Sequence, residues 1–189
     1  MNPIAFAAYR RQYHAIDIRL VEQGSKRLEE LVLAGELDLA GALLPVGDAF
    51  AWREVCREPI DLLIEADHPL AQRAEVALQD LAEQPFILFA EGFALNPIIL
   101  DACRRSGFEP EIATQSSQID FVIELAACGL GVAFLPRLIA HQRRHAGVRR
   151  VPITDPSMIW RIAMIWRRGG QLPHAAQAWI DLALKARTG

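Results

Sequence analysis

The chain has 189 residues, 52% of them hydrophobic and 23% charged, which is the composition of a folded globular protein and excludes a disordered chain, a collagen and a coiled coil. The formal net charge is −3. We therefore do not expect this chain to bind nucleic acid by itself, because DNA-binding proteins gather Lys and Arg side chains against the phosphates.

Helical and strand periods alternate in the first quarter of the chain. Residues 3–13 have the period of an amphipathic helix, and residues 16–21 alternate apolar and polar side chains as a short strand does. An apolar i, i+3, i+4 stripe then predicts a helix that ends at Gly35. The mostly apolar run over residues 37–44 stops at Pro45 and is typical of a strand buried on both faces.

The same alternation continues to the C-terminus. Further strands are predicted over residues 53–58, 60–65, 86–89, 111–115, 132–135, 148–153 and 159–166, and helices between Asn96 and Gly107, between Ile119 and Gly129, and over residues 173–186. Asn96 is predicted to cap its helix, and Ser117–Asp120 has the spacing of a capping box. Repeated strand–helix–strand units predict an α/β class with a mostly parallel sheet. In such folds ligands lie beyond the carboxyl ends of the strands.

The sequence contains no segment typical of a secreted or membrane-spanning protein. The most apolar window, Phe121–Pro136, includes Glu124 and two glycines, so it does not provide the roughly 20 apolar residues that a bilayer requires. The three cysteines are odd in number and widely spaced, which favours a reducing cytoplasm over a disulfide framework. We expect all three to be small buried hydrophobic residues.

Motifs for catalysis, cofactors and metals are missing from the sequence. Gly129-Leu130-Gly131 follows a predicted helix and precedes a strand, the reverse of the order in dinucleotide-binding proteins. His141 and His145 are four residues apart, but no acid lies in the same turn to complete a metal site. We therefore expect no metal and no cofactor.

Two acidic residues are the remaining candidates for catalysis. Glu22 and Glu91 lie at predicted strand-to-helix loops, where a general acid and base could be placed. Exposed loop acids that interact with helix dipoles explain them more simply, since most of the 23 acidic side chains must be solvated. We expect that this chain is not an enzyme.

Three predicted helix N-termini are preceded by small, apolar or hydroxyl residues, namely Gln23-Gly24-Ser25, Phe93-Ala94-Leu95 and Ser116-Ser117. Each offers unbonded backbone N–H groups and the positive end of a helix dipole, which suit a carboxylate. Each is also explained as an ordinary helix cap. Three such termini at one end of an α/β fold together favour a site for a small anion.

Four stretches in sequence order carry a resemblance to a known family. They are residues 6–13 with 17–22, Leu33–Ala40 (LAGELDLA), His68–Ala71 (HPLA) and Cys128–Pro136 (CGLGVAFLP). They are similar to the effector-binding domain of LysR-type transcriptional regulators. The resemblance implies a type 2 periplasmic-binding-protein-like fold with two lobes and two crossover strands, in which residues 1–62 and 163–189 form lobe one and residues 63–162 form lobe two.

The resemblance also implies which residues bind a ligand. In this family a small effector, commonly an organic acid, binds in the cleft between the lobes. The corresponding positions of this sequence are Gly24, Ser25, Phe93, Ala94, Leu95, Ser116, Ser117 and Phe134. The function implied is ligand sensing that modulates DNA binding and transcription. A solute-binding protein of the same fold is the alternative, and an enzyme is a more distant third.

Two parts of the family pattern have no counterpart in this sequence. The winged helix-turn-helix and linker helix are absent, so DNA binding is expected only through an N-terminal domain that this chain does not contain. The match begins inside the first helix, so lobe one is expected to lack its first strand. By resemblance, helix 3–13 and strand 16–21 form the surface of a homodimer or homotetramer.

Overall fold

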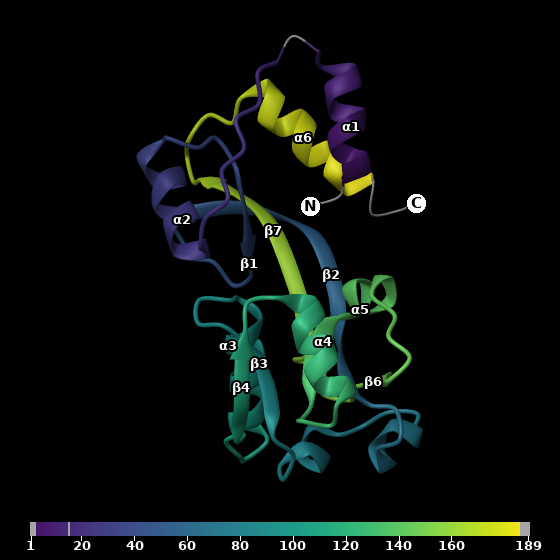
Figure 1. Ribbon diagram of the computed structural model, residues 1–189. Coiled ribbons are helices and arrows are strands. Elements are labelled where there is room, and N and C mark those ends of the chain that lie inside the picture. The colour runs from purple at the N-terminus through teal and green to yellow at the C-terminus, as the bar shows by residue number, and fades with distance from the viewer. Residues whose placement is uncertain (1–2, 15, 186–189) are drawn as a thin grey trace. The chain divides into compact units, whose positions relative to one another are not determined.

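The computed structural model describes residues 3–14 and 16–185 and divides the chain into two compact units. Unit 1 comprises Met1–Arg57 and Arg161–Gly189, and unit 2 comprises Glu58–Trp160. The boundaries fall inside the two long strands β2 (Phe50–Glu65) and β7 (Ile159–Arg167), which are labelled in Figure 1. Each strand therefore contributes one part to each unit.

Unit 1 contains a small antiparallel sheet and three helices: α1 (Pro3–Gln12), α2 (Ser25–Ala34) and α6 (His174–Lys185). Strand β1 (Ala40–Leu43) pairs antiparallel with β7, with Ala40 opposite Ile165. In the sheet β7 lies between β1 and β2. β1 is therefore an edge strand, because it has a partner on one side only among the described residues.

Helix α2 forms where its apolar stripe predicted it. Leu31 and Val32 are buried, and Val32 belongs to the same apolar cluster as Ala163 and Ile165 of β7. Gly35 ends the helix with φ of 75°, a left-handed conformation that costs a glycine little. Helices α1 and α6 also pack together, where the ring of Tyr9 meets that of Trp179 edge-on at 5.3 Å between centroids.

Unit 2 has its own strands and helices. The strands are β3 (Phe86–Phe89), β4 (Ile112–Ser116), β5 (Ala133–Pro136) and β6 (Val148–Pro152), and the helices are α3 (Leu95–Arg105), α4 (Ile119–Ala127), α5 (Arg137–Gln142) and the short 3₁₀ turns Pro69–Gln72 and Leu78–Leu81. β2 pairs antiparallel with both β5 and β6, whereas β3 and β4 pair in parallel.

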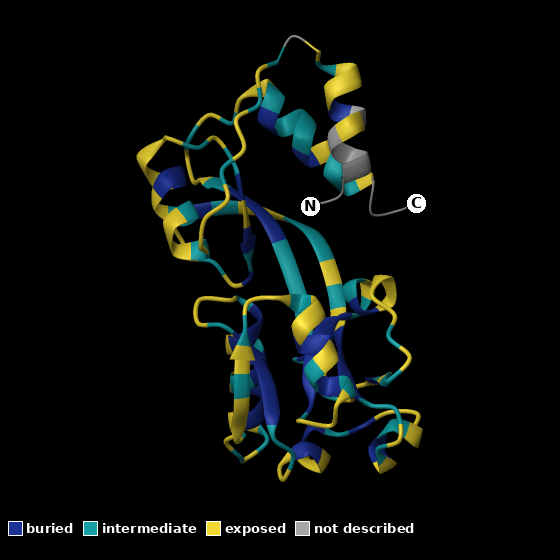
Figure 2. Ribbon diagram, viewed as in Figure 1, coloured by how far each residue is buried: buried dark blue, intermediate teal, exposed yellow. Residues whose placement is uncertain are grey.

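The core of unit 2 is continuous and apolar. Every residue of β3 and of β5 is buried, and β3 is dark blue in Figure 2. Val122 and Ala126, from the amphipathic stripe of α4, are fully buried in the same cluster. Strands covered on both faces read as unbroken apolar runs, which explains why β3 and β5 were predictable from sequence.

Several predictions need correction. The sheet is not mostly parallel: β1–β7, β2–β5 and β2–β6 are all antiparallel, because an apolar run reports burial and not strand direction. Residues 16–21 form no strand, since they pair with no other strand in the described part of the chain. The two strands predicted at 53–58 and 60–65 are one continuous strand, β2. Residue 186, predicted to end α6, lies outside the described residues.

Two further observations concern membranes and thiols. Within residues 3–14 and 16–185, no helix is long and apolar enough to cross a bilayer. Of the cysteines expected to be buried, Cys103 is buried, Cys56 is half-buried and Cys128 is exposed. The prediction for Cys128 was wrong because this residue follows the last turn of α4, where the helix has left the core.

Candidate functional site

The carboxyl ends of β3 and β4 bring two of the predicted binding segments to one edge of unit 2. The strands are parallel, and Phe89 lies opposite Ser116 in their register. Just beyond, the N–H of Ala90 donates to the carbonyl of Ser116 at 3.0 Å. Helix α3 begins a few residues after β3, and helix α4 begins a few residues after β4, so both helix N-termini follow the same edge of the sheet. This is where ligands bind in α/β sheets.

Asn96 fixes the loop that leads from β3 into α3. Its side chain is 8% exposed, donates from Nδ2 to the carbonyl of Phe89 at 2.7 Å and accepts at Oδ1 from the N–H of Phe89 at 3.1 Å. The predicted role of Asn96 as the cap of α3 was wrong. The cap is Ala94, and Asn96 lies within the first turn with its side chain turned back to β3.

Phe93 presents an apolar surface on this loop. Its ring is 39% exposed and stacks on Phe89, with 5.2 Å between centroids. The turn is possible because Gly92 adopts φ of 86°. Ala94 is half-buried and Leu95 is buried at 4% exposure, so of these three predicted residues Phe93 offers the most accessible side chain.

The N-terminus of α4 has backbone donors without a side-chain acceptor. The predicted capping box of Ser117–Asp120 does not form: the cap residue is Gln118, and it makes no side-chain capping bond. The hydroxyl of Ser116 instead accepts from the N–H of Gln118 at 3.1 Å. Ser117 is exposed, and its hydroxyl has no hydrogen-bond partner within the described ranges. The first-turn amides of α4 and this hydroxyl suit an anion.

One acidic side chain lies in the first turn of α4. Asp120 is exposed, and its carboxylate accepts a hydrogen bond from Nε of Arg143 at 2.8 Å. The guanidinium offsets the charge of Asp120. The helix N-terminus therefore keeps its positive end without a strong local negative charge.

Phe134 does not present its side chain at the surface of unit 2. It is 1% exposed, and its ring lies 5.0 Å from that of Phe86 in the core. The ring of Phe134 thus packs against a residue of β3 in the core. The family resemblance implied Phe134 as a binding residue in the strand after Gly129, and a resemblance in sequence carries no information about the direction of a side chain on β5.

Gly24 and Ser25 are the predicted binding residues of unit 1. Gly24 is the cap residue of α2, with φ of −61° and ψ of 152°, and it makes no side-chain capping bond. Ser25 is the first helical residue and is half-buried, and its hydroxyl has no hydrogen-bond partner among residues 3–14 and 16–185. The start of α2 thus offers the same kind of donors as the start of α4.

The residues considered for catalysis or metal binding do not come together in the described part of the structure. Glu22 lies in unit 1 and Glu91 in unit 2, and both are exposed. His145 lies outside α5 and so does not share a helix face with His141; its Nε2 lies 3.3 Å from a carboxylate oxygen of Glu124. Among the described residues, no three His, Cys, Asp or Glu side chains gather as metal ligands would.

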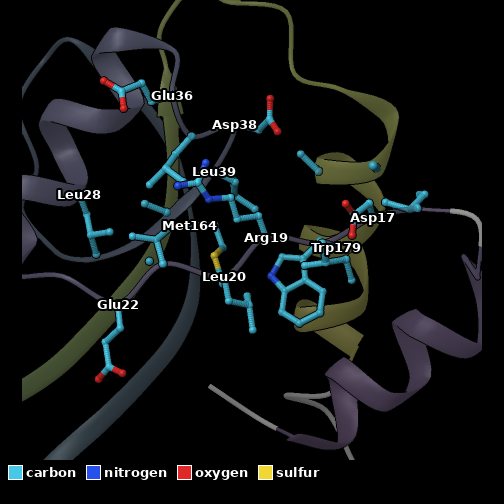
Figure 3. Close-up of a pocket in the computed structure, with 18 of the residues that line it drawn as sticks. Asp17, Arg19, Leu20, Glu22, Leu28, Glu36, Asp38, Leu39, Met164 and Trp179 are labelled. Carbon is cyan, nitrogen blue, oxygen red and sulfur yellow. The ribbon is translucent and has the colours of Figure 1, made fainter.

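A groove in unit 1 was not predicted from the sequence. It has a volume of about 820 Å³ and runs between residues 16–23 and the start of β1 (Figure 3). None of the eight predicted binding residues lines it. The signal that could have indicated it is the alternation of residues 16–21, a strand pattern for which the described chain provides no partner strand.

Comparison with known proteins identifies the family. Residues 3–188 match the LysR substrate binding domain. An uncharacterised HTH-type transcriptional regulator of Bacillus subtilis, YwbI, is 34% identical over 180 residues, which cover 95% of this chain and 60% of that protein. The chain thus spans about 60% of the length of this relative, whose name is that of a regulator and not an enzyme.

Solved structures share the fold. The BenM effector-binding domain with its effector benzoate superposes with a TM-score of 0.87 at 22% identity, covering 98% of this chain and 85% of that chain. The effector-binding domain of QuiR in complex with shikimate gives a TM-score of 0.81 at 18% identity, covering 98% and 90%. The α/β architecture with two crossover strands is therefore that of LysR effector-binding domains. On this evidence the chain belongs to the LysR substrate-binding-domain family.

Proposed function

We propose that this chain is the ligand-sensing domain of a transcriptional regulator and that its effector is a small organic carboxylate. The observation that favours a carboxylate as the effector is the set of hydrogen-bond donors at the N-terminus of α4. There the first-turn amides lack a side-chain acceptor, the hydroxyl of Ser117 is exposed, and Asp120 is paired with Arg143. Such a set of donors binds a carboxylate better than a cation or a neutral molecule.

The remaining contacts follow from the same reasoning. Phe93 provides an apolar surface for the body of the effector, and Ser116 and Ala94 contribute backbone groups at the ends of β4 and of the loop before α3. In unit 1, Gly24 and Ser25 at the start of α2 offer donors of the same kind. In unit 2, Leu95 and Phe134 support the loop before α3 and the end of β4 through the core. Benzoate and shikimate, which the two solved relatives bind, are both carboxylates.

The regulatory role is proposed on the family assignment. The effector shifts the population of conformations of the domain, and this shift changes how DNA-binding domains carried by the longer protein meet their operator in the cytoplasm. α1 and residues 16–21 supply the surface of a homodimer or homotetramer. Ala7, Arg10 and Arg11 of α1 are exposed, as this role requires.

A thermal-shift screen tests the proposal. Benzoate, shikimate and a panel of other small carboxylates are compared with neutral counterparts, such as benzamide for benzoate. A carboxylate at 100 times its Kd stabilises the folded chain by about 2.7 kcal/mol, which corresponds to a rise in Tm of roughly 5–10 °C for a chain of this length. Benzamide is expected to give no shift. A panel in which no carboxylate raises Tm, or in which the neutral amides act equally well, contradicts the proposal.

A further inference from the structure

Residues 143–147, which connect α5 to β6, run along helix α4, and we call this segment the strap. The strap begins at the first turn of α4, where Nε of Arg143 donates to Oδ1 of Asp120 at 2.8 Å. It passes Glu124 one turn further on, where Nε2 of His145 lies 3.3 Å from Oε1 of that residue. The strap is thus held to the start and to the middle of the helix.

The far end of the strap lies against Ala127, the last residue of α4. A Cβ placed on Gly147 would lie 3.2 Å from the Cβ of Ala127, so the absence of a side chain lets the two backbones approach closely. The N–H of Gly147 also donates to Nδ1 of His145 at 3.1 Å, which leaves Nε2 to carry the imidazole proton beside Glu124. Positions 120, 124 and 127 share one face of a helix, so the strap follows this face from the first turn to the last.

The contact between Arg143 and Asp120 needs this support. The two side chains are 40% and 82% exposed, and exposed ion pairs of this kind are weak. The bond from Nε is the one hydrogen bond that Arg143 makes with a side chain of the described residues. The pair alone therefore holds the guanidinium loosely, and the position of its backbone in the strap decides how close it stays to Asp120.

The charge of Asp120 matters because it lies in the same helical turn as the amides assigned to the carboxylate. An uncompensated carboxylate at this place repels an anion and opposes the positive end of the helix dipole. When Arg143 lies against it, the two charges cancel. The affinity of the α4 N-terminus for an anion therefore depends on a residue that the strap positions.

We propose that the strap controls the affinity of the α4 N-terminus for carboxylates, with His145 and Gly147 as positioning residues that act through Arg143. His145 and Gly147 do not contact the carboxylate. They hold Arg143 against Asp120, and the cancelled charge lets the first-turn amides bind an anion. The inference rests on the proposed function and concerns none of the eight residues assigned to the effector.

Two variants that break the same ion pair are expected to change the affinity in opposite directions. The probe is the carboxylate that raises Tm most in the thermal-shift panel, and calorimetric titration measures its Kd. Arg143→Gln leaves Asp120 uncompensated and weakens binding about fivefold, whereas Asp120→Asn leaves the cation and tightens binding about fivefold. The double variant is expected to bind within about twofold of wild type, because it is again neutral.

Arg73→Gln is the matched control for the change in charge. It breaks another exposed ion pair of unit 2, between Arg73 and Asp80 at 2.9 Å, and is expected to leave Kd unchanged. A purely structural role of the Arg143 pair would give a different pattern. Both single variants would then weaken binding, and the double variant would bind no better than Arg143→Gln, which overturns the inference.

His145→Leu tests the strap itself. The variant removes the acceptor for the N–H of Gly147 and the contact with Glu124, and it is expected to weaken Kd about threefold, less than the loss of the Arg143 charge. In the double variant Asp120→Asn with Arg143→Gln no charge remains to be balanced, so the same change should leave Kd unaltered. An effect of His145→Leu that persists in this background shows that His145 supports α4 itself and overturns the inference.

Ionic strength provides a readout that a structural role would not move. Salt screens exposed charges, so the fivefold difference between Arg143→Gln and wild type is expected to fall below about twofold when salt is raised from about 0.02 M to about 0.5 M. A difference that stays the same at both salt concentrations contradicts the inference.

The two proposals fail in different ways. If no carboxylate of the panel binds the wild-type chain, the proposed function is wrong and this inference falls with it. If a carboxylate binds but Arg143→Gln and Asp120→Asn shift Kd in the same direction, or leave it unchanged, the proposed function stands and this inference alone is wrong.

Discussion

Asn96 takes the place of a neighbouring strand for Phe89. In β3 the N–H of Ile87 donates to the carbonyl of Val132 at 2.8 Å, and Phe89, two residues on, directs its backbone groups to the same side. The backbone groups of Phe89, however, bond to a side chain and not to a strand. The Oδ1 of Asn96 accepts from the N–H of Phe89, and its Nδ2 donates to the carbonyl of Phe89. β3 thus ends in a fixed position, and the loop that carries Phe93 starts from it.

Asn96→Ala is therefore expected to destabilise the chain. The change leaves the N–H and carbonyl of Phe89 without partners in a buried place, at a cost of about 2–4 kcal/mol. Asn96→Asp is the control, because its carboxylate still accepts from the N–H but no longer donates to the carbonyl. Urea unfolding measures both. A loss below about 0.5 kcal/mol for Asn96→Ala would show that the pair does not hold the loop.

Arg137 and Asp61 form a second pair on which the fold of unit 2 depends. The Asp61 side chain is 5% exposed and accepts three hydrogen bonds of 2.8–3.1 Å from Arg137, which raise the pKa of that guanidinium. Arg137→Met leaves a buried carboxylate without its cation, which costs about 3–5 kcal/mol in the free energy of unfolding.

The double variant Asp61→Leu with Arg137→Met is the control for this pair. It removes both charges and recovers most of the lost stability, because an apolar pair of similar volume avoids desolvating a charge. Chemical denaturation of the three proteins provides the comparison. A double variant that is less stable than Arg137→Met alone contradicts this account.

The thiols of Cys103 and Cys128 are expected to differ in reactivity. Burial raises the pKa of the Cys103 thiol to about 11, so about one thiol in a thousand is ionised at pH 8. Cys128 is exposed. A disulfide reagent such as dithionitrobenzoate should modify Cys128 within minutes and Cys103 only after unfolding, and Cys128→Ser should remove the fast phase. A fast phase that persists in Cys128→Ser and disappears in Cys103→Ser would contradict the burial of Cys103.

Tyr9 links the packing of α1 on α6 to pH. Its hydroxyl donates to the carbonyl of Ala175 at 2.8 Å, and burial, with a smaller contribution from Tyr13, raises its pKa above the usual value near 10. A raised pKa means that the neutral phenol is favoured in the folded state. This stability is fully present below pH 10 and is lost as the pH rises through the pKa of the folded protein.

Tyr9→Phe measures that contribution. The variant is expected to lose about 1 kcal/mol at pH 8, the value of one hydrogen bond. The difference in the free energy of unfolding between wild type and variant should shrink above pH 10. Other groups that titrate in this range do not affect the difference, because both proteins contain them. Free energies of unfolding measured between pH 8 and pH 11 test this. A difference that stays constant over that range would exclude Tyr9 as its source.

Elements with a complete local signal were predictable from the sequence. The stripe of α4, the glycine that ends α2 and the buried run Phe86–Phe89 all lie where they were expected, because helical periodicity, a left-handed C-cap and burial on two faces leave marks in a few adjacent residues. Residues 16–21 show where such local signals fail. Their pattern is that of a strand, but a strand forms only when it pairs with another strand, and the local sequence does not show whether such a partner is present.

The place of the candidate segments at the end of β3 and β4 was predictable from the sequence, and the direction of their side chains was less so. Ser116, Ser117 and Phe93 lie at one sheet edge because parallel strands must end together. Whether a side chain at such an edge points outward depends on packing: Phe134 is directed into the core, and Asn96 turns back to β3. Neither direction follows from the spacing of residues.

Calorimetric titration of the chain with the carboxylate that raises Tm most in the thermal-shift panel tests the central claim most directly. This carboxylate is expected to bind, and Ser117→Ala to weaken its Kd by about tenfold, since the loss of one hydrogen bond to a charged group is worth about 1.5 kcal/mol or more. Ser106→Ala, at the opposite end of α3, is the matched control and should leave Kd unchanged. If no carboxylate of the panel binds, or if Ser117→Ala binds as tightly as Ser106→Ala, the assignment of the α4 N-terminus as the carboxylate site is wrong.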